Sequence, residues 1–217
     1  MDNINSMKSV RDKTRGLTNL WLFESNKNSK RFSIRGDTDF AQLVLLEGDV
    51  SVRSYDLYPI VVRNSPSFSA ELVPLALVEY NDGAQKYIQC VEKESNLKQE
   101  VLKYNKNVEV AHGYYYELIS NVQVWSNKIL IDNWIFLSSV IARAKRFSMH
   151  REMQLAVEAI IVKKITITLE ELLNIEGIDP SLMLGAVGLL LQRGAIHADL
   201  ETELFSYATV MGAERNG

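Results

Sequence analysis

A group of side chains in the first half of the chain could hold a metal ion or orient a water molecule: Asp39, Glu71, Glu79, Glu92 and Lys93. Carboxylate oxygens are the ligands that Mg²⁺ prefers, and a nearby lysine can help to activate water for hydrolysis. Lys93 shares a strand face with Gln89 and Val91, because side chains alternate along a strand. Glu71 precedes Leu75 by four positions, which is about 13 Å along a strand. Side chains at these two positions are therefore too far apart to bind the same metal ion. A hydrolytic site built from some of these side chains nevertheless remains an alternative.

Other reactive side chains have simpler structural explanations. The three histidines, His112, His150 and His197, lie far apart in the sequence, so neither a zinc site nor a proton relay is expected. Cys90 is the only cysteine, which excludes an intramolecular disulfide, and in an apolar strand it is expected to be a small buried hydrophobe. Glu47 could ligate a metal, but a carboxylate on an otherwise apolar helix is expected at the solvated edge.

The charge of the chain is unevenly distributed, although the formal net charge is only -3. Residues 1–36 contain eight lysines or arginines and three acids, residues 143–164 contain six and two, and the last 53 residues contain two and eight. Such basic segments either form solvated surface or contact nucleic-acid phosphates. The candidate DNA-binding residues are Lys8, Arg11, Lys13, Arg15, Arg143, Lys145, Arg146 and Arg151.

The elements that would position these groups follow an α/β pattern. Residues 38–48 have helical spacing, with Asp37 or Thr38 as the expected N-cap. Residues 50–63 alternate as a strand that is interrupted near Pro59. Two apolar runs then flank an Asn-Asp-Gly turn, which predicts a β-hairpin over residues 71–93.

Further along, residues 94–108 and 133–146 are expected to be helices, with a strand beginning at Gly113 between them. Upstream, the polar residues 26–30 are expected to be a flexible connection to a basic arm. The order of elements predicts one α/β domain whose sheet is covered on both faces.

The C-terminal part of the chain is predicted to be mainly helical. Residues 148–162 have a helical pattern, residues 165–167 are typical of a short strand, and Thr168 with Glu171 forms a capping box for a short helix. A longer helix is expected to begin at Asp179-Pro180.

That longer helix is expected to end at Gly194, and residues 195–209 are expected to form two short strands. Helix, strand, helix, turn, helix and hairpin is the order of a winged helix. Residues 181–192 are apolar around most of the helix circumference, so we expect this helix to be buried. The C-terminal domain, residues 148–217, is therefore expected to pack against the first domain or a protein partner and to make little direct contact with DNA.

At residues 36–59, the sequence GDTDFAQLVLLEGDVSVRSYDLYP resembles the TnsA family, the endonuclease subunit of heteromeric transposases with a restriction-endonuclease-like fold. Asp39 falls at the position of the family's helical Glu, and Asp49 and Val52 match the family pattern. Tyr58-Pro59 occupies the position of the family's Gln-Pro. The resemblance continues through VPLALVEYNDGAQKYIQCVEKES and GYYYELIS and covers roughly residues 32–145. The winged helix that follows is similar to the family's second domain.

The resemblance implies a nuclease that holds Mg²⁺ on carboxylates from the helix and from the two hairpin strands, with a lysine that orients water. When the metal-binding motif of the family is aligned at the hairpin turn, its Asp falls on Leu75, its Glu or Gln on Gln89, and its Lys on Val91. Leucine and valine offer no ligand or charge, so a degenerate centre with no metal cofactor is expected. A displaced active centre would use Asp39, Gln89 and Lys93 with Mg²⁺.

The sequence therefore predicts a DNA-binding and partner-docking subunit of a transposition complex, whose partners are duplex DNA and a transposase or ATPase subunit. An active Mg²⁺-dependent endonuclease cutting at transposon ends is one alternative, and a winged-helix regulator or phage-type scaffold protein is another. The expected organisation is a basic arm (1–30), a TnsA-like domain (31–147) and a winged-helix domain (148–217). With no signal-like segment and no 18-residue apolar run, a cytoplasmic location is expected and a membrane partner is not.

Overall fold

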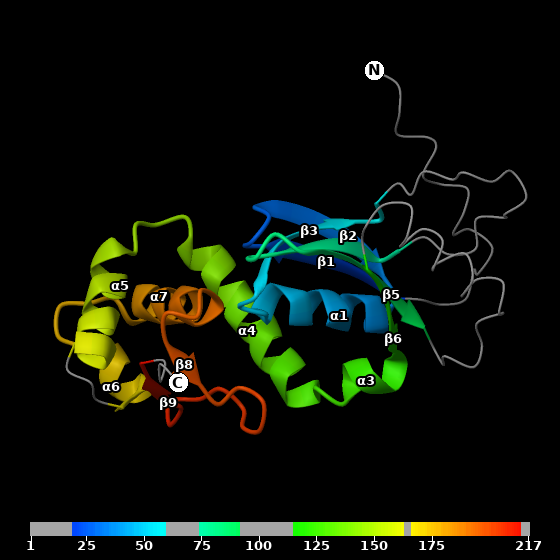
Figure 1. Cartoon of the computed structure of the whole chain (residues 1–217). Helices are drawn as coiled ribbons and strands as arrows, with labels where there is room; N and C mark the ends of the chain where they lie inside the picture. Colours follow the sequence, from blue (N-terminus) through cyan, green and yellow to red (C-terminus); the bar gives the residue numbers. More distant parts are fainter. Residues whose placement is uncertain (1–18, 60–73, 92–114, 163–165, 214–217) are drawn as a thin grey trace, which may run out of the picture.

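The computed structural model of the chain describes residues 19–59, 74–91, 115–162 and 166–213. It begins with a two-stranded antiparallel sheet, here called the ribbon, formed by β1 (Leu20–Ser25) and β2 (Lys30–Arg35). α1 (Asp37–Gly48) follows, and Figure 1 shows it lying beneath the ribbon. Side chains alternate along both strands of the ribbon, so that Phe23 and Ile34 are buried while their neighbours are exposed.

A four-stranded mixed sheet comes next, with the order β3-β4-β5-β6. Its strands are β3 (Val52–Leu57), β4 (Ala76–Tyr80), β5 (Gln85–Val91) and β6 (Tyr115–Ser120). β6 runs parallel to β5, and the other two pairings are antiparallel. The predicted hairpin is confirmed, and Gly83 in its turn has a φ of 85, which glycine adopts without steric penalty. The predicted mixed α/β class is confirmed as well.

The remainder is mainly helical, with a small three-stranded sheet of order β7-β9-β8. The elements are α3 (Asn121–Trp125), α4 (Lys128–Ala144), α5 (His150–Val157), the π-helical turn η2 (Glu158–Val162), β7 (Ile167–Thr168), α6 (Leu169–Leu173), α7 (Pro180–Gln192), β8 (His197–Ala198) and β9 (Val210–Gly212). In Figure 1, α4 runs between α1 on one side and α5 and α7 on the other. Among the described helices, none combines the length and the apolar character needed to cross a membrane.

The caps predicted for the C-terminal helices are confirmed. Thr168 and Glu171 form a reciprocal capping box at the start of α6, and the Asp179 side chain accepts from the backbone N–H groups of Ser181 and Leu182 at the start of α7. The prediction that the apolar helix packs against protein is also confirmed, because α7 is almost entirely buried against α4 and α5. The main apolar core therefore continues from α1 and the sheet through α4 to α7.

Two local expectations were wrong, and one short helix was missed. Residues 26–30, predicted as a flexible connection, form the turn between β1 and β2 and begin β2. The N-cap of α1 is Gly36, without a side-chain cap, and the Asp37 carboxylate instead accepts from Asn19 Nδ2 at 2.9 Å and from Trp21 Nε1 at 2.8 Å. These two hydrogen bonds lower the pKa of Asp37. The short helix α3, capped by Ser120, was not expected.

Some predicted elements lie outside the described residues. They are the end of the strand beyond residue 59, the helix at residues 94–108 and the start of the strand at Gly113. The helix predicted at residues 133–146 is present as α4, which begins earlier, at Lys128.

Candidate nucleic-acid interface

The residues of the expected nuclease centre lie on α1 and on the central hairpin. Asp39 is half-buried on α1, whereas Gln89 is buried on β5, where its Nε2 donates to the carbonyl oxygen of Cys90 at 2.8 Å. Leu75 is fully buried immediately before β4, and its backbone N–H donates to Ile88 in β5. Lys93 lies outside the described residues.

No three histidine, cysteine or carboxylate side chains are placed to share a metal ion within the described part of the chain. At the positions expected for the motif Asp and Lys, the fully buried Leu75 presents methyl groups and the half-buried Val91 presents an apolar side chain, neither of which is an oxygen ligand or a cation. Within the described residues, the hairpin therefore provides only the Gln89 amide at the three motif positions.

Glu47 is the most strongly connected polar side chain in this region, and the prediction that it lies at a solvated edge was wrong. Its side chain is fully buried at the end of α1. Five donors from the ribbon, its turn, β3 and α7 bind its two oxygens: Ser25 Oγ at 2.8 Å, the backbone N–H of Asn26 at 2.7 Å, the backbone N–H of Lys27 at 3.0 Å, Tyr55 Oη at 2.5 Å and Gln192 Nε2 at 2.9 Å. This carboxylate ties the ribbon turn to α1, β3 and α7.

Lys27 completes this polar network beside Glu47. Its Nζ donates to the backbone carbonyl oxygens of Asp49 and Val52. Burial lowers the pKa of Lys27 to about 8, although the charges of Glu47 and Asp49 oppose this shift. Burial, reinforced by the negative charge of Glu47, raises the pKa of Tyr55, so this hydroxyl stays a hydrogen-bond donor at physiological pH.

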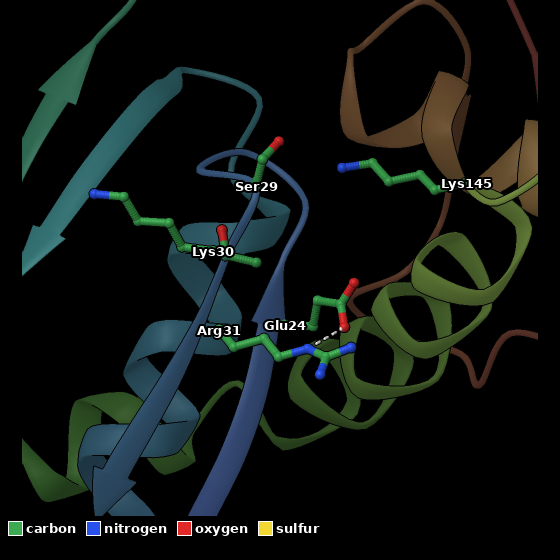
Figure 2. A pocket seen from close by; sticks show the side chains of 6 residues that line it. Glu24, Ser29, Lys30, Arg31 and Lys145 are labelled. Atoms are coloured by element: carbon green, nitrogen blue, oxygen red, sulfur yellow. Dashed lines mark hydrogen bonds and ion pairs between the residues drawn. The ribbon is translucent and has the colours of Figure 1, made fainter.

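On the solvent side of this network, an open pocket of about 200 Å³ separates the ribbon turn from the end of α4. It is lined by Glu24, Ser25, Ser29, Lys30, Arg31 and Lys145. Figure 2 shows Lys145 extending from the end of α4 toward the turn that carries Ser29, while Lys30 extends away from it on the other side of the ribbon. Because the Lys30 ammonium is directed away, Arg31, Lys145 and Glu24 give the side of the pocket that faces α4 a formal charge of +1.

Existing contacts limit how much of that charge is available to a ligand. The Arg31 guanidinium pairs with Glu24 at 2.9 Å, and both side chains are substantially exposed, so solvent weakens this pair. Lys145 Nζ donates to the carbonyl oxygen of Asn26 at 2.9 Å. Partial burial lowers the pKa of Lys145, and the nearby charge of Arg193 acts in the same direction, whereas Glu47 and Glu24 oppose the shift. An ammonium has three donors, so one bond to Asn26 leaves two for a phosphate.

A scan against protein-family models finds no match, and a search of the curated proteins finds none either.

The basic residues predicted from sequence cluster only in part. Arg143, Lys145 and Arg146 are exposed around the C-terminal end of α4, and of these three Lys145 lines the pocket. Arg151 is exposed in the first turn of α5. The other four candidates, Lys8, Arg11, Lys13 and Arg15, lie outside the described residues.

Sequence reasoning missed Lys30 and Arg31 as individual site residues, because it assigned residues 26–30 to a flexible connection and recognised no strand at Arg31. The signal for them was present in the alternation of large apolar side chains, with Trp21 and Phe23 before the turn and Phe32 and Ile34 after it. Two such runs around a short polar turn are typical of a hairpin, which places the basic side chains of its second strand next to the turn.

Proposed function

We propose that this chain is a duplex-DNA-binding and partner-docking subunit of a transposition complex, with a TnsA-like fold and an inactive nuclease centre. The observation that carries the DNA-binding part is the basic surface where the ribbon turn meets the end of α4, here called the basic corner. It is defined by Arg31, Arg143, Lys145 and Arg146. Phosphate contacts of this kind supply most of the sequence-independent affinity of proteins for DNA.

The chain topology supports the TnsA-like part of the proposal. α1 packs against the strands, and the hairpin that carries Leu75 and Gln89 lies in the centre of the mixed sheet. The order α5, β7, α6, α7, β8 and β9, with β9 paired between β7 and β8, supports a winged helix in the C-terminal part. α7 is buried against α4 and α5, so this winged helix would not offer α7 to a DNA groove.

Inactivity follows from the chemistry at the motif positions. Mg²⁺ requires several oxygen ligands, and phosphodiester hydrolysis depends on the bound ion to activate water and stabilise the leaving oxygen. Leu75 and Val91 provide neither oxygen nor positive charge. The protein would thus hold DNA for a partner that carries out the cutting and joining.

Replacing Arg143 and Arg146 together with glutamine tests the basic corner without disturbing the core, because both side chains are exposed. We expect the affinity of the full-length protein for a random-sequence duplex to fall about tenfold at 100 mM salt, because two phosphate contacts are lost. Fluorescence anisotropy measures the affinity. The slope of log affinity against log salt should become shallower by about 2.

The matched control removes the same charge elsewhere, with Lys128→Gln at the opposite end of α4 and Arg53→Gln on β3. Both side chains are exposed and lie in surface ion pairs, with Asp132 and Glu79 respectively, so folding should be little affected. An equal loss of affinity in the control protein would show that net charge, and not the basic corner, determines binding.

A further inference from the structure

The outer face of the ribbon carries a mixture of side chains unlike that of ordinary solvated surface. Successive cross-strand pairs on this face are Leu20 with Arg35, Leu22 with Ser33, and Glu24 with Arg31, and all six residues are exposed. Leu22 is 80% exposed and Leu20 is 61% exposed, so two large apolar side chains lie next to each other in solvent. The six residues are here called the outer face.

The opposite face fixes the ribbon rigidly to the rest of the protein. Trp21 stacks on Phe40 of α1 with ring centroids 4.4 Å apart, Phe23 meets the same ring edge-on at 6.0 Å, and Phe32 packs near Tyr55 at 5.8 Å. The Glu47 network holds the turn. The outer face is therefore a preformed surface, which lowers the entropic cost of binding.

The outer face lies next to the basic corner. Glu24 and Arg31 belong both to the outer face and to the lining of the pocket that Lys145 reaches from α4. A phosphate backbone held at the basic corner would consequently run past the outer face, and the adjacent groove would lie over it. This step depends on the DNA-binding function proposed above.

We infer that the outer face of the ribbon enters the major groove of duplex DNA and reads base edges. The major groove is about 12 Å wide and admits a two-stranded ribbon. Arginine donates two hydrogen bonds to guanine, serine bonds to any base edge, and an apolar side chain contacts the methyl group of thymine. Arg35, Ser33 and Leu22 match these three roles, and the positive charge of Arg31, which lies nearer the basic corner, complements the phosphate backbone beside the groove.

The test begins with selection of duplexes from a random pool by the full-length protein, followed by affinity measurements on the selected sequence. We expect Arg35→Ala to lower the preference for a guanine at one position by about 5- to 150-fold, the range for one bidentate contact. Binding to unselected DNA should fall only slightly. Arg53→Ala, which removes an exposed arginine from β3, is the control and should leave the preference unchanged.

A chemical substitution in the DNA tests Leu22 independently. Replacing the contacted thymine by uracil removes one methyl group, and we expect the wild-type affinity to fall about fourfold. The Leu22→Ala protein should bind the two duplexes equally. Both ribbon variants change exposed side chains, so their thermal transitions should match that of the wild type and exclude misfolding as the cause.

The outcomes separate this inference from the function on which it rests. Failure of the wild-type protein to bind any duplex would overturn both. Salt-sensitive binding that weakens with Arg143→Gln and Arg146→Gln, but shows no base preference altered by Arg35→Ala or Leu22→Ala, would overturn groove reading alone. Under that result the outer face would serve another occupant, such as a protein partner.

Discussion

Replacing Glu47 with alanine is expected to lower the free energy of unfolding by about 3–5 kcal/mol, the range for removing one partner from a buried charged network. The substitution would leave five donors without an acceptor around a side chain that is fully buried. Chemical denaturation monitored by tryptophan fluorescence measures the change. We expect the ribbon turn to detach first, because three of the five donors come from Ser25, Asn26 and Lys27.

Two variants accompany this measurement. Glu47→Gln keeps the shape and one acceptor oxygen, so it should cost less than Glu47→Ala while still exceeding ~1 kcal/mol. Glu201→Ala removes an exposed carboxylate and should change stability by no more than about 0.5 kcal/mol. A Glu47→Ala protein as stable as the Glu201→Ala protein would show that the five hydrogen bonds do not hold the ribbon to α7.

Gly185→Ala is expected to destabilise the protein by about 3 kcal/mol through overpacking between α7 and α4. A Cβ at position 185 would lie 2.2 Å from the Cβ of Ala144 and 3.0 Å from the sulfur of Met149. Because an alanine methyl cannot rotate away, the two helices would have to separate along their buried interface. Gly188→Ala is the control on the same helix, since its Cβ would meet the more adaptable Ile141 side chain at 3.0 Å. This control should cost about 1 kcal/mol or less, because alanine also gains helix propensity.

A compensating change sharpens the packing test. Ala144→Gly removes the methyl group that Gly185→Ala would strike, so the double variant should be more stable than the sum of the two single effects predicts. Thermal or urea denaturation of the wild type, the two single variants and the double variant gives the coupling free energy between positions 144 and 185. Strict additivity of the two effects would contradict a direct contact between positions 144 and 185.

Local signals in the sequence predicted those elements that local chemistry determines. The Asn-Asp-Gly turn specified the β4–β5 hairpin, and Asp179-Pro180 specified the start of α7, because turns and caps depend on residues only a few positions apart. The ribbon was missed because the polar residues Asn26 to Lys30 resemble a linker when β1 and β2 are not recognised as a pair.

The role of Glu47 could not be predicted in the same way. Its donors are 8 to 145 positions away in the chain, and their convergence depends on the complete tertiary structure. A carboxylate in an apolar helix is usually solvated, and only the arrangement of five donors makes its burial favourable. Lys145 was predicted as a DNA-binding residue from local charge alone, whereas its position opposite the ribbon turn depends on how α4 packs.

The central claim, that the protein holds duplex DNA through the basic corner without cutting it, is tested most directly by titrating the full-length chain against a labelled duplex with Mg²⁺ present. The salt concentration is varied from 50 to 200 mM, and the recovered DNA is examined for nicks. Three phosphate contacts, from Arg143, Lys145 and Arg146, predict a slope of log affinity against log salt of about -2.7, with the DNA left intact. Binding that does not change with salt, or Mg²⁺-dependent nicking that Asp39→Ala abolishes, would contradict the account.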